Sequence, residues 1–138
     1  MSSLYVESSA VLAWLFGESH SKEVIARIND AESVVTSVLT VLEIERALVR
    51  AEKQNLLRAA EGRKLHGLFA GAARSWTLME ISEDVRAGAA RVFPVEPVRT
   101  LDAIHLSTAL LFITAFPDLQ LLTFDKRISE NAQALGID

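Results

Sequence analysis

Short apolar runs alternate with longer segments of helical periodicity along the whole chain. The short runs are rich in apolar or β-branched residues and are bounded by polar ones, which is typical of buried strands. Strands alternating with helices favour an α/β fold in which helices cover both faces of a parallel sheet of about four to five strands. The pattern predicts strands at residues 4–7, 33–36, 77–81 and 119–124, and helices at residues 10–16, 21–28, 38–53, 56–73, 84–93, 101–116 and 128–135.

Capping residues support several of these boundaries. Ser37 and Thr100 are suitable N-caps for the third and sixth helices, and Gly136 is well placed to end the last one. Residues 38–53 and 56–73 are consecutive and both helical in pattern, so we expect them to form a helical hairpin.

Composition indicates a soluble, cytoplasmic protein with one domain over residues 1–138. Half of the residues are hydrophobic, which excludes a disordered chain. The absence of cysteine excludes disulfides and thiolate metal sites. The N-terminus does not resemble a signal peptide, and the longest apolar stretch, residues 103–116, is too short to span a bilayer. We therefore expect no membrane partner.

Four acidic residues stand where a strand or helix is predicted to begin or end. They are Glu7, Glu43, Asp102 and Asp125. Ligands of open parallel α/β sheets bind beyond the carboxyl ends of the strands, so these carboxylates can converge in one cleft. Grouped carboxylates suit a hard cation such as Mg²⁺ or Mn²⁺, which points to phosphate chemistry. The net charge of −4 is unlike that of a general nucleic-acid binder, but a cation at the four acids would make the local field attractive to phosphate.

Each of these residues also has a purely structural interpretation. Asp102 alone is an ordinary helix-start acid, and Asp125 is a suitable N-cap for the last helix. Only one of Glu43 and Glu45 can face the cleft, because residues two apart point to different sides of a helix. Helix geometry leaves the choice open; the motif to which Glu43 belongs favours Glu43, and we expect Glu45 to pair with a neighbouring base such as Lys or Arg. His105 follows Asp102 by one helical turn; it is a metal ligand, a proton carrier or, the interpretation we favour, a core histidine with one satisfied nitrogen.

Four motifs in order along the chain resemble the PIN-domain nucleases, particularly the VapC-type ribonuclease toxins of bacterial toxin–antitoxin pairs. The most specific is LDAIHLSTA at residues 101–109. The others are YVESSA at residues 5–10, TSVLTVLEI at residues 36–44 and LTFDKR at residues 122–127. The resemblance spans nearly the whole chain.

This resemblance implies a three-layer PIN-like fold and a Mg²⁺- or Mn²⁺-dependent endoribonuclease, the toxin of a type II pair. It implies that Glu7, Glu43, Asp102 and Asp125 are both the catalytic and the metal-binding residues, with Asp102 and Glu43 as the core ligands. Ser9 and Thr123 become secondary polar candidates. Independently of the family, two ionised carboxylates 5 Å apart repel by roughly 3 kcal/mol at an effective dielectric of about 20, so four need a cation or shared protons.

The resemblance also implies partners. They are an RNA substrate cleaved to a 5′-phosphate and a 3′-hydroxyl, a cognate antitoxin and a second copy of the chain. Residues 10–16 and 38–53 carry more apolar surface, including Trp14 and Phe16, than a small domain easily hides, which favours a homodimer. Basic residues that could contact phosphate follow or flank the motif acids, although we favour an ordinary solvated face as their explanation; they are Arg99, Lys126, Arg127, Arg46, Arg50 and Lys53.

Position 7 departs from the family pattern, which has Asp where this chain has Glu. The extra methylene displaces the carboxylate by more than about 1 Å unless the side chain folds back, and such a shift can lower a rate on the order of a hundredfold. We therefore expect reduced activity and keep a weakened RNA- or protein-binding module as the alternative. A receiver-type phosphoacceptor protein would need an acidic pair after the first strand, and Glu7 stands there alone.

Overall fold

The computed structural model describes residues 2–138, which form four strands and seven helices around one sheet. All strands run parallel in the spatial order β3-β2-β1-β4. The strands are β1 (Ser3–Val6), β2 (Ser33–Ser37), β3 (Thr77–Met79) and β4 (Gln120–Leu122). The helices are α1 (Ser8–Leu15), α2 (Ser21–Asp30), α3 (Val38–Lys53), α4 (Ala59–Ala73), α5 (Glu83–Ala89), α6 (Thr100–Phe112) and α7 (Lys126–Leu135).

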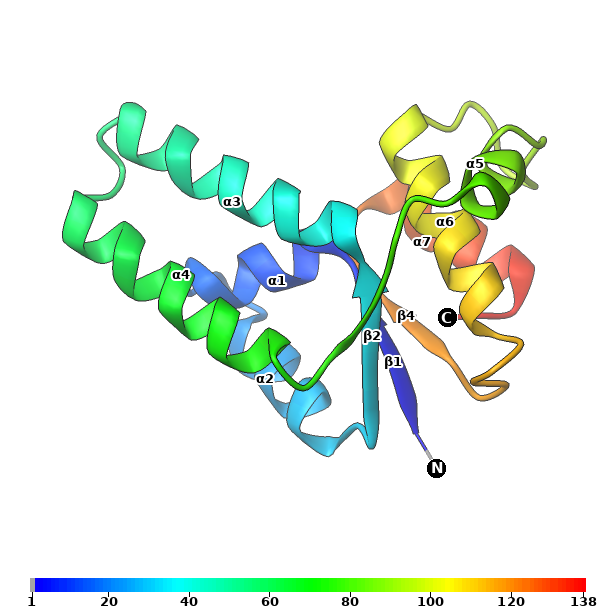
Figure 1. Cartoon of the computed structure of the whole chain (residues 1–138), viewed down its shortest axis with the longest axis horizontal. Coiled ribbons are helices and arrows are strands. Elements are labelled where there is room, and N and C mark those ends of the chain that lie inside the picture. Colours follow the sequence, from blue (N-terminus) through cyan, green and yellow to red (C-terminus); the bar gives the residue numbers. More distant parts are fainter. Residues whose placement is uncertain (1) are drawn as a thin grey trace.

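Helices cover both faces of the sheet, which confirms the predicted three-layer α/β fold. Helices α1 to α4 lie on one side, and α5 to α7 lie on the other (Figure 1). The central strand β1 is buried along its whole length, and its side chains alternate between two cores. Leu4 and Val6 belong to the core beneath α1 to α4, whereas Tyr5 packs with α6 and α7 in the other.

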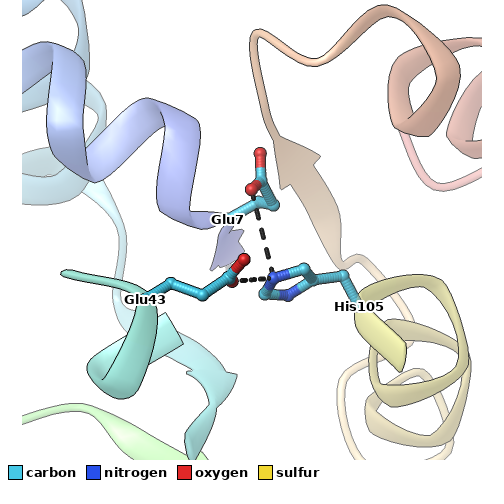
Figure 2. Close-up of side chains that lie close together, drawn as sticks. All are labelled: Glu7, Glu43 and His105. Carbon is cyan, nitrogen blue, oxygen red and sulfur yellow. Dashed lines mark hydrogen bonds and ion pairs between the residues drawn. The ribbon is translucent and has the colours of Figure 1, made fainter. Parts of the chain in front are cut away.

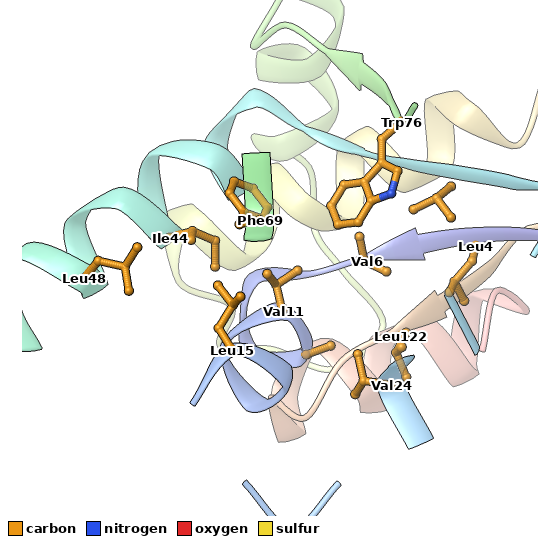
Figure 3. Packing of buried hydrophobic residues seen from close by; sticks show 12 residues of the cluster. Leu4, Val6, Val11, Leu15, Val24, Ile44, Leu48, Phe69, Trp76 and Leu122 are labelled. Carbon is orange, nitrogen blue, oxygen red and sulfur yellow. The ribbon is translucent and has the colours of Figure 1, made fainter. Parts of the chain in front are cut away.

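The helical hairpin predicted from residues 38–53 and 56–73 is present as α3 and α4, which pack against each other. Ile44 and Leu48 of α3 and Phe69 of α4 reach the core beside Trp76 (Figure 3). The Phe69 and Trp76 rings meet edge to face with centroids 5.9 Å apart. Trp76 is therefore a packing residue, and the hairpin projects from the sheet on a well-packed base.

Two of the three predicted caps are confirmed. The Ser37 side chain accepts a hydrogen bond from the backbone N–H of Leu39, and Gly136 ends α7 at a φ of 78°. The prediction for Thr100 is wrong, because Thr100 is already helical and Arg99 occupies the N-cap position. The first turn closes on the Arg99 carbonyl, which accepts from the Ala103 N–H at 2.8 Å.

Several predicted elements are too long. Helix α4 begins at Ala59 rather than residue 56, because Asn55 adopts a φ of 60° and the Leu56 N–H turns back to the Ala51 carbonyl. Helix α5 ends at residue 89 rather than 93, and Phe93 leaves it to join the core.

The other differences are smaller. Helix α6 ends at Phe112 rather than residue 116, and strands β3 and β4 cover three residues each. Within residues 2–138, no helix is both long enough and apolar enough to cross a membrane.

Candidate functional site

The four predicted acids lie around the carboxyl edge of the sheet. Glu7 directly follows β1, and Asp125 follows β4, which pairs in parallel with β1. Glu43 lies in the second turn of α3, whose first residue directly follows β2. Asp102 lies in the first turn of α6. The ends of β1, β2 and β4 bring Glu7, Glu43 and Asp125 to one edge, and the loop before α6 brings Asp102 into the same pocket as Asp125.

Glu7 is folded back against its own chain. Its side chain is the N-cap of α1 and is only 4% exposed. Oε2 accepts hydrogen bonds from Ser8 Oγ at 2.6 Å and from the backbone N–H of Ser9 at 3.1 Å. Oε1 accepts from Ser9 Oγ at 2.6 Å and from Thr123 Oγ1 at 2.5 Å. Four donors therefore surround this carboxylate.

These donors keep Glu7 ionised despite its burial. Burial alone would raise the pKa of the Glu7 carboxyl, but nearby His105 and the hydroxyls of Ser8, Ser9 and Thr123 bring it below its ordinary value. A buried carboxylate with this many hydrogen bonds is a stable anion.

Ser9 and Thr123 tie two strand ends together. Besides binding Glu7, Ser9 Oγ accepts from the Phe124 N–H at 2.8 Å, and Thr123 Oγ1 accepts from the Asp125 N–H at 3.0 Å. The end of β1 and the end of β4 thus share one network. Both residues are secondary candidates from the sequence, and both contact Glu7 directly.

Glu43, His105 and Glu7 lie together at this edge (Figure 2). Ser8 Oγ also links the two glutamates by donating to both. Its Oε1 lies 2.6 Å from His105 Nε2 and accepts from Ser8 Oγ at 3.0 Å. His105 Nε2 lies 4.0 Å from Glu7 Oε2. Glu45 points away and lies 3.5 Å from His66 of α4, so its basic partner is a histidine rather than a lysine or arginine.

His105 has partners at both ring nitrogens, not at one as expected for a core histidine. Its Nδ1 lies 2.8 Å from the hydroxyl of Tyr5, and its ring is 1% exposed. Burial raises the pKa of the Tyr5 hydroxyl, so this group stays protonated. Tyr5, His105 and Glu43 therefore form a continuous hydrogen-bonded relay, which runs from the core beneath α6 and α7 to the site.

Asp102 and Asp125 line an adjoining pocket with a volume of about 400 Å³. Arg99, Lys126 and Arg127 line the same pocket. Partial burial, followed by the charges of Asp125 and Glu7, raises the pKa of the Asp102 carboxyl. Partial burial and the neighbouring carboxylates therefore both disfavour the charged form of Asp102.

Asp125 combines a structural position with a place in this pocket. Its Oδ1 accepts from the Ile128 N–H at 2.9 Å, which makes it the N-cap of α7. The capping interpretation is confirmed, and Oδ2 accepts no hydrogen bond from residues 2–138. The Arg127 guanidinium donates a hydrogen bond to the Glu96 carbonyl at 3.1 Å, which holds this side chain in place.

The structure thus divides the predicted acids into two neighbouring sets. Within residues 2–138, the group whose ligand atoms lie within 4.8 Å of one another is Glu7, Glu43 and His105. Asp102 and Asp125 lie outside it, in the adjoining pocket. His105 is the member that the sequence did not place in the site, although its spacing of one turn from Asp102 was the available signal.

An open groove leads away from Glu43 on its other side. It has a volume of about 450 Å³, and Ser8 and Glu43 line it together with apolar side chains of α1 and α3. Arg46 and Arg50 of α3 also line it, one and two turns beyond Glu43. The acids are therefore flanked by positive charge on two sides.

Comparison with known proteins identifies the class. The model of the PIN domain family matches residues 4–134, and the chain belongs to this family. Two relatives from Mycobacterium tuberculosis are each 32% identical to it. Ribonuclease VapC35 aligns over 136 residues, covering 97% of this chain and 93% of that protein. Ribonuclease VapC46 aligns over 138 residues, covering 99% and 95%.

Solved structures support the same fold. A toxin–antitoxin complex from Klebsiella pneumoniae aligns with a TM-score of 0.62 at 17% identity, covering 94% of this chain and 89% of that one. Mycobacterium tuberculosis VapC20, described as a sarcin–ricin loop cleaving toxin, aligns with a TM-score of 0.62 at 12% identity, covering 98% and 96%. At these identities, the likeness concerns the fold alone.

Proposed function

We propose that this protein is a divalent-metal-dependent endoribonuclease and the toxin of a type II toxin–antitoxin pair. The observation that carries the proposal is the gathering of Glu7, Glu43, Asp102 and Asp125 around one sheet edge of a PIN domain. Full-length relatives at 32% identity are named ribonucleases. The activity follows from the family together with this site.

The donor set suits a hard cation. Within residues 2–138, Glu43 Oε2, Asp125 Oδ2 and both carboxylate oxygens of Asp102 accept no hydrogen bond from the protein. These oxygens can therefore bind a cation without losing a hydrogen bond. At Glu7, by contrast, a cation would have to compete with the four hydrogen bonds that the carboxylate already accepts. The raised pKa of Asp102 is a second sign, because partial burial and the neighbouring carboxylates disfavour its charged form and a bound cation would favour it.

We therefore assign Asp102, Glu43 and Asp125 as the direct metal-binding residues, with Glu7 completing the negative charge of the site. Because Asp102 and Asp125 lie outside the group of Glu7, Glu43 and His105, these side chains have to move closer together to share one cation. Mg²⁺ and Mn²⁺ both accept oxygen ligands of this kind. Bound there, such a cation would supply the charge that activates a water for in-line attack on a phosphodiester and stabilises the leaving oxygen. The network of Ser8, Ser9 and Thr123 holds the Glu7 carboxylate rigidly beside these groups.

Positive side chains on either side give RNA a path across the acids. Arg99 and Lys126 are exposed and line the pocket of Asp102 and Asp125, where they can contact backbone phosphates. Arg46 and Arg50 line the groove beyond Glu43. An RNA strand that contacts both sides would place a phosphodiester over the carboxylates between them.

We also propose two protein partners, a cognate antitoxin and a second copy of the chain. The apolar side chains of Phe16 and Leu42 are 37% and 56% exposed, and they line grooves formed by α1 and α3. The remaining surface of such a groove suits a segment of an antitoxin. The solved relative from Klebsiella pneumoniae is itself a toxin–antitoxin complex.

A PIN-like module that binds RNA or protein without efficient cleavage remains the second candidate. The complete hydrogen bonding of Glu7 favours it, because a carboxylate with four internal donors has the least to gain from a metal. The free oxygens of Glu43, Asp102 and Asp125 favour the nuclease.

The Asp102→Asn variant tests the proposal. It keeps the shape of the side chain and removes its charge, so we expect Mn²⁺-dependent RNA cleavage to be abolished while the fold persists. Without metal, the variant should melt at or above the parent temperature, because the repulsion at this position is gone. With Mn²⁺ at about 100 times its Kd, the parent should gain about 2.7 kcal/mol and the variant far less.

Asp118→Asn, an exposed acid in the loop before β4, is the matched control and should behave like the parent. If Asp102→Asn cleaves RNA at the parent rate, the site is wrongly assigned. If the parent binds RNA and Mn²⁺ without cleaving any RNA offered, the binding module becomes the better description.

A further inference from the structure

The hydrogen-bonded relay of Tyr5, His105 and Glu43 is the least expected feature of the site. It joins three elements, since Tyr5 comes from β1, His105 from α6 and Glu43 from α3. Tyr5 and His105 are 0% and 1% exposed, and their rings meet edge to face with centroids 6.0 Å apart. The histidine is thus held by packing as well as by its hydrogen bonds.

Donors and acceptors follow one another in a single direction along this relay, from Tyr5 to Glu43. A Tyr5 hydroxyl that donates to Nδ1 leaves the ring proton on Nε2, which then donates to Glu43 Oε1 at 2.6 Å. Ser8 Oγ donates to the same oxygen at 3.0 Å. The two donors hold one oxygen of Glu43 and leave Oε2 without a protein partner within residues 2–138.

Glu43 needs such a constraint. Its side chain is 26% exposed and has three rotatable bonds, and it starts from a helix on the opposite side of the sheet from α6. The contact with His105 Nε2 holds this side chain at the carboxyl edge of the sheet, and Asp102 lies one turn before His105 on the same helix. Groups that orient ligand carboxylates in this way tune metal binding without touching the metal.

We propose that His105 is a positioning residue, which Tyr5 orients and which fixes Glu43 in the geometry that binds the cation. This inference rests on the proposed metal-dependent function, and it assigns His105 a role outside the ligand set. Loss of a partner of this kind lowers metal affinity by about 10- to 100-fold.

Two amide substitutions at one position separate the two contacts of the ring. In His105→Gln, the amide reaches the place of Nε2 and can still donate to Glu43. In His105→Asn, the shorter amide takes the place of Nδ1 and keeps only the Tyr5 contact. Each variant loses one hydrogen bond of the relay, so they form a matched pair for stability.

The measurement is Mn²⁺ affinity by isothermal titration calorimetry, with melting temperatures recorded in chelator. We expect His105→Asn to bind Mn²⁺ about 10- to 100-fold more weakly than the parent and His105→Gln to stay within about threefold of it. Their melting temperatures should be similar. Single-turnover cleavage at saturating RNA should follow the Mn²⁺ affinities, with little change in RNA affinity measured in chelator.

Three results would overturn the inference: parent-like Mn²⁺ affinity in His105→Asn, an equal loss in both variants, or coupling of ¹⁵N-labelled histidine to bound Mn²⁺ in pulsed electron paramagnetic resonance. The last would make His105 a ligand. Should His105→Asn fail to fold, Tyr5→Phe is the second variant, because it keeps the ring and removes the hydroxyl. We expect it to weaken Mn²⁺ binding severalfold, and parent-like affinity would refute the role of Tyr5.

Asp102→Asn, measured in parallel, separates this inference from the function on which it rests. If Asp102→Asn retains parent Mn²⁺ affinity and cleavage, the metal site itself is misassigned. If Asp102→Asn loses both while His105→Asn keeps parent affinity, the metal site stands and only the positioning of Glu43 fails.

Discussion

Shortening Glu7 to Asp is the most direct test of how this chain accommodates its departure from the family pattern. The carboxylate is 4% exposed and accepts four hydrogen bonds from three side chains and one backbone N–H. Removing one methylene retracts the carboxylate by about 1.5 Å. An Asp can still cap α1 through Ser9, since Asp is a preferred N-cap, but it cannot also reach Thr123 beside β4.

The expected cost follows from the bonds that are lost. A hydrogen bond to a charged group contributes about 1.5 to 3 kcal/mol, and one or two such bonds are broken. The missing methylene adds about 0.8 kcal/mol of lost burial. The retained cap offsets part of this, so we expect Glu7→Asp to lower the free energy of unfolding by about 2 to 4 kcal/mol. For a domain of this size, that lowers the melting temperature by roughly 10 °C.

Urea and thermal unfolding in chelator measure this cost, with Glu32→Asp as a control because Glu32 is exposed. A double-mutant cycle with Thr123→Val assigns it: the effects of Glu7→Asp and Thr123→Val should be less than additive, because both remove the same bond. A Glu7→Asp protein that melts within about 2 °C of the parent and is additive with Thr123→Val would refute the reasoning. We also expect no gain in cleavage, so a tenfold rise in single-turnover rate would show that the extra methylene limits the enzyme.

Two further predictions concern partners. Replacing Arg99 or Lys126 by Ala should weaken RNA binding by a similar factor for unrelated RNA sequences, and each change should lower the salt dependence of binding by about one phosphate contact. Fluorescence anisotropy titrations measure both effects. Unchanged binding would show that RNA does not pass over this pocket. Light scattering should give twice the monomer mass, and Leu42→Lys should reduce it if α3 contributes to the interface; a monomer at high micromolar concentration would contradict the dimer.

The strands and the general position of the acids were predictable because they depend on local chemistry. A central parallel strand is buried on both faces, so β1 reads as a short apolar run that ends at its first charge, Glu7. Helix geometry shows that only one of Glu43 and Glu45 can face the cleft, and the family motif selects Glu43. In the structure, Glu43 contacts His105 at the sheet edge, whereas Glu45 contacts His66 of α4.

The helix ends and the side-chain partners were not predictable, because they depend on contacts between distant segments. Apolar periodicity continues past Phe112 and Ala89, yet the residues beyond them pack into the core from loops. The fold-back of Glu7 needs a donor 116 positions away, Thr123, and no local pattern reveals this. His105 looked like a core residue because it is one; what the sequence lacks is the 62-residue link to Glu43.

The two sets of acids differ in how well the protein compensates their negative charge. Glu7 is compensated by its four hydrogen-bond donors, and its pKa is lowered. Asp102 has no such donors within residues 2–138, and burial together with its acidic neighbours raises its pKa. The unbalanced negative charge therefore lies on the open side of the site, beside the pocket that Arg99 and Lys126 line. A cation that binds there gains the most favourable interaction and lies on the side from which a phosphate can approach. On this argument, Glu7 contributes its buried charge to the site, and its longer side chain is accommodated in the fold by four hydrogen bonds.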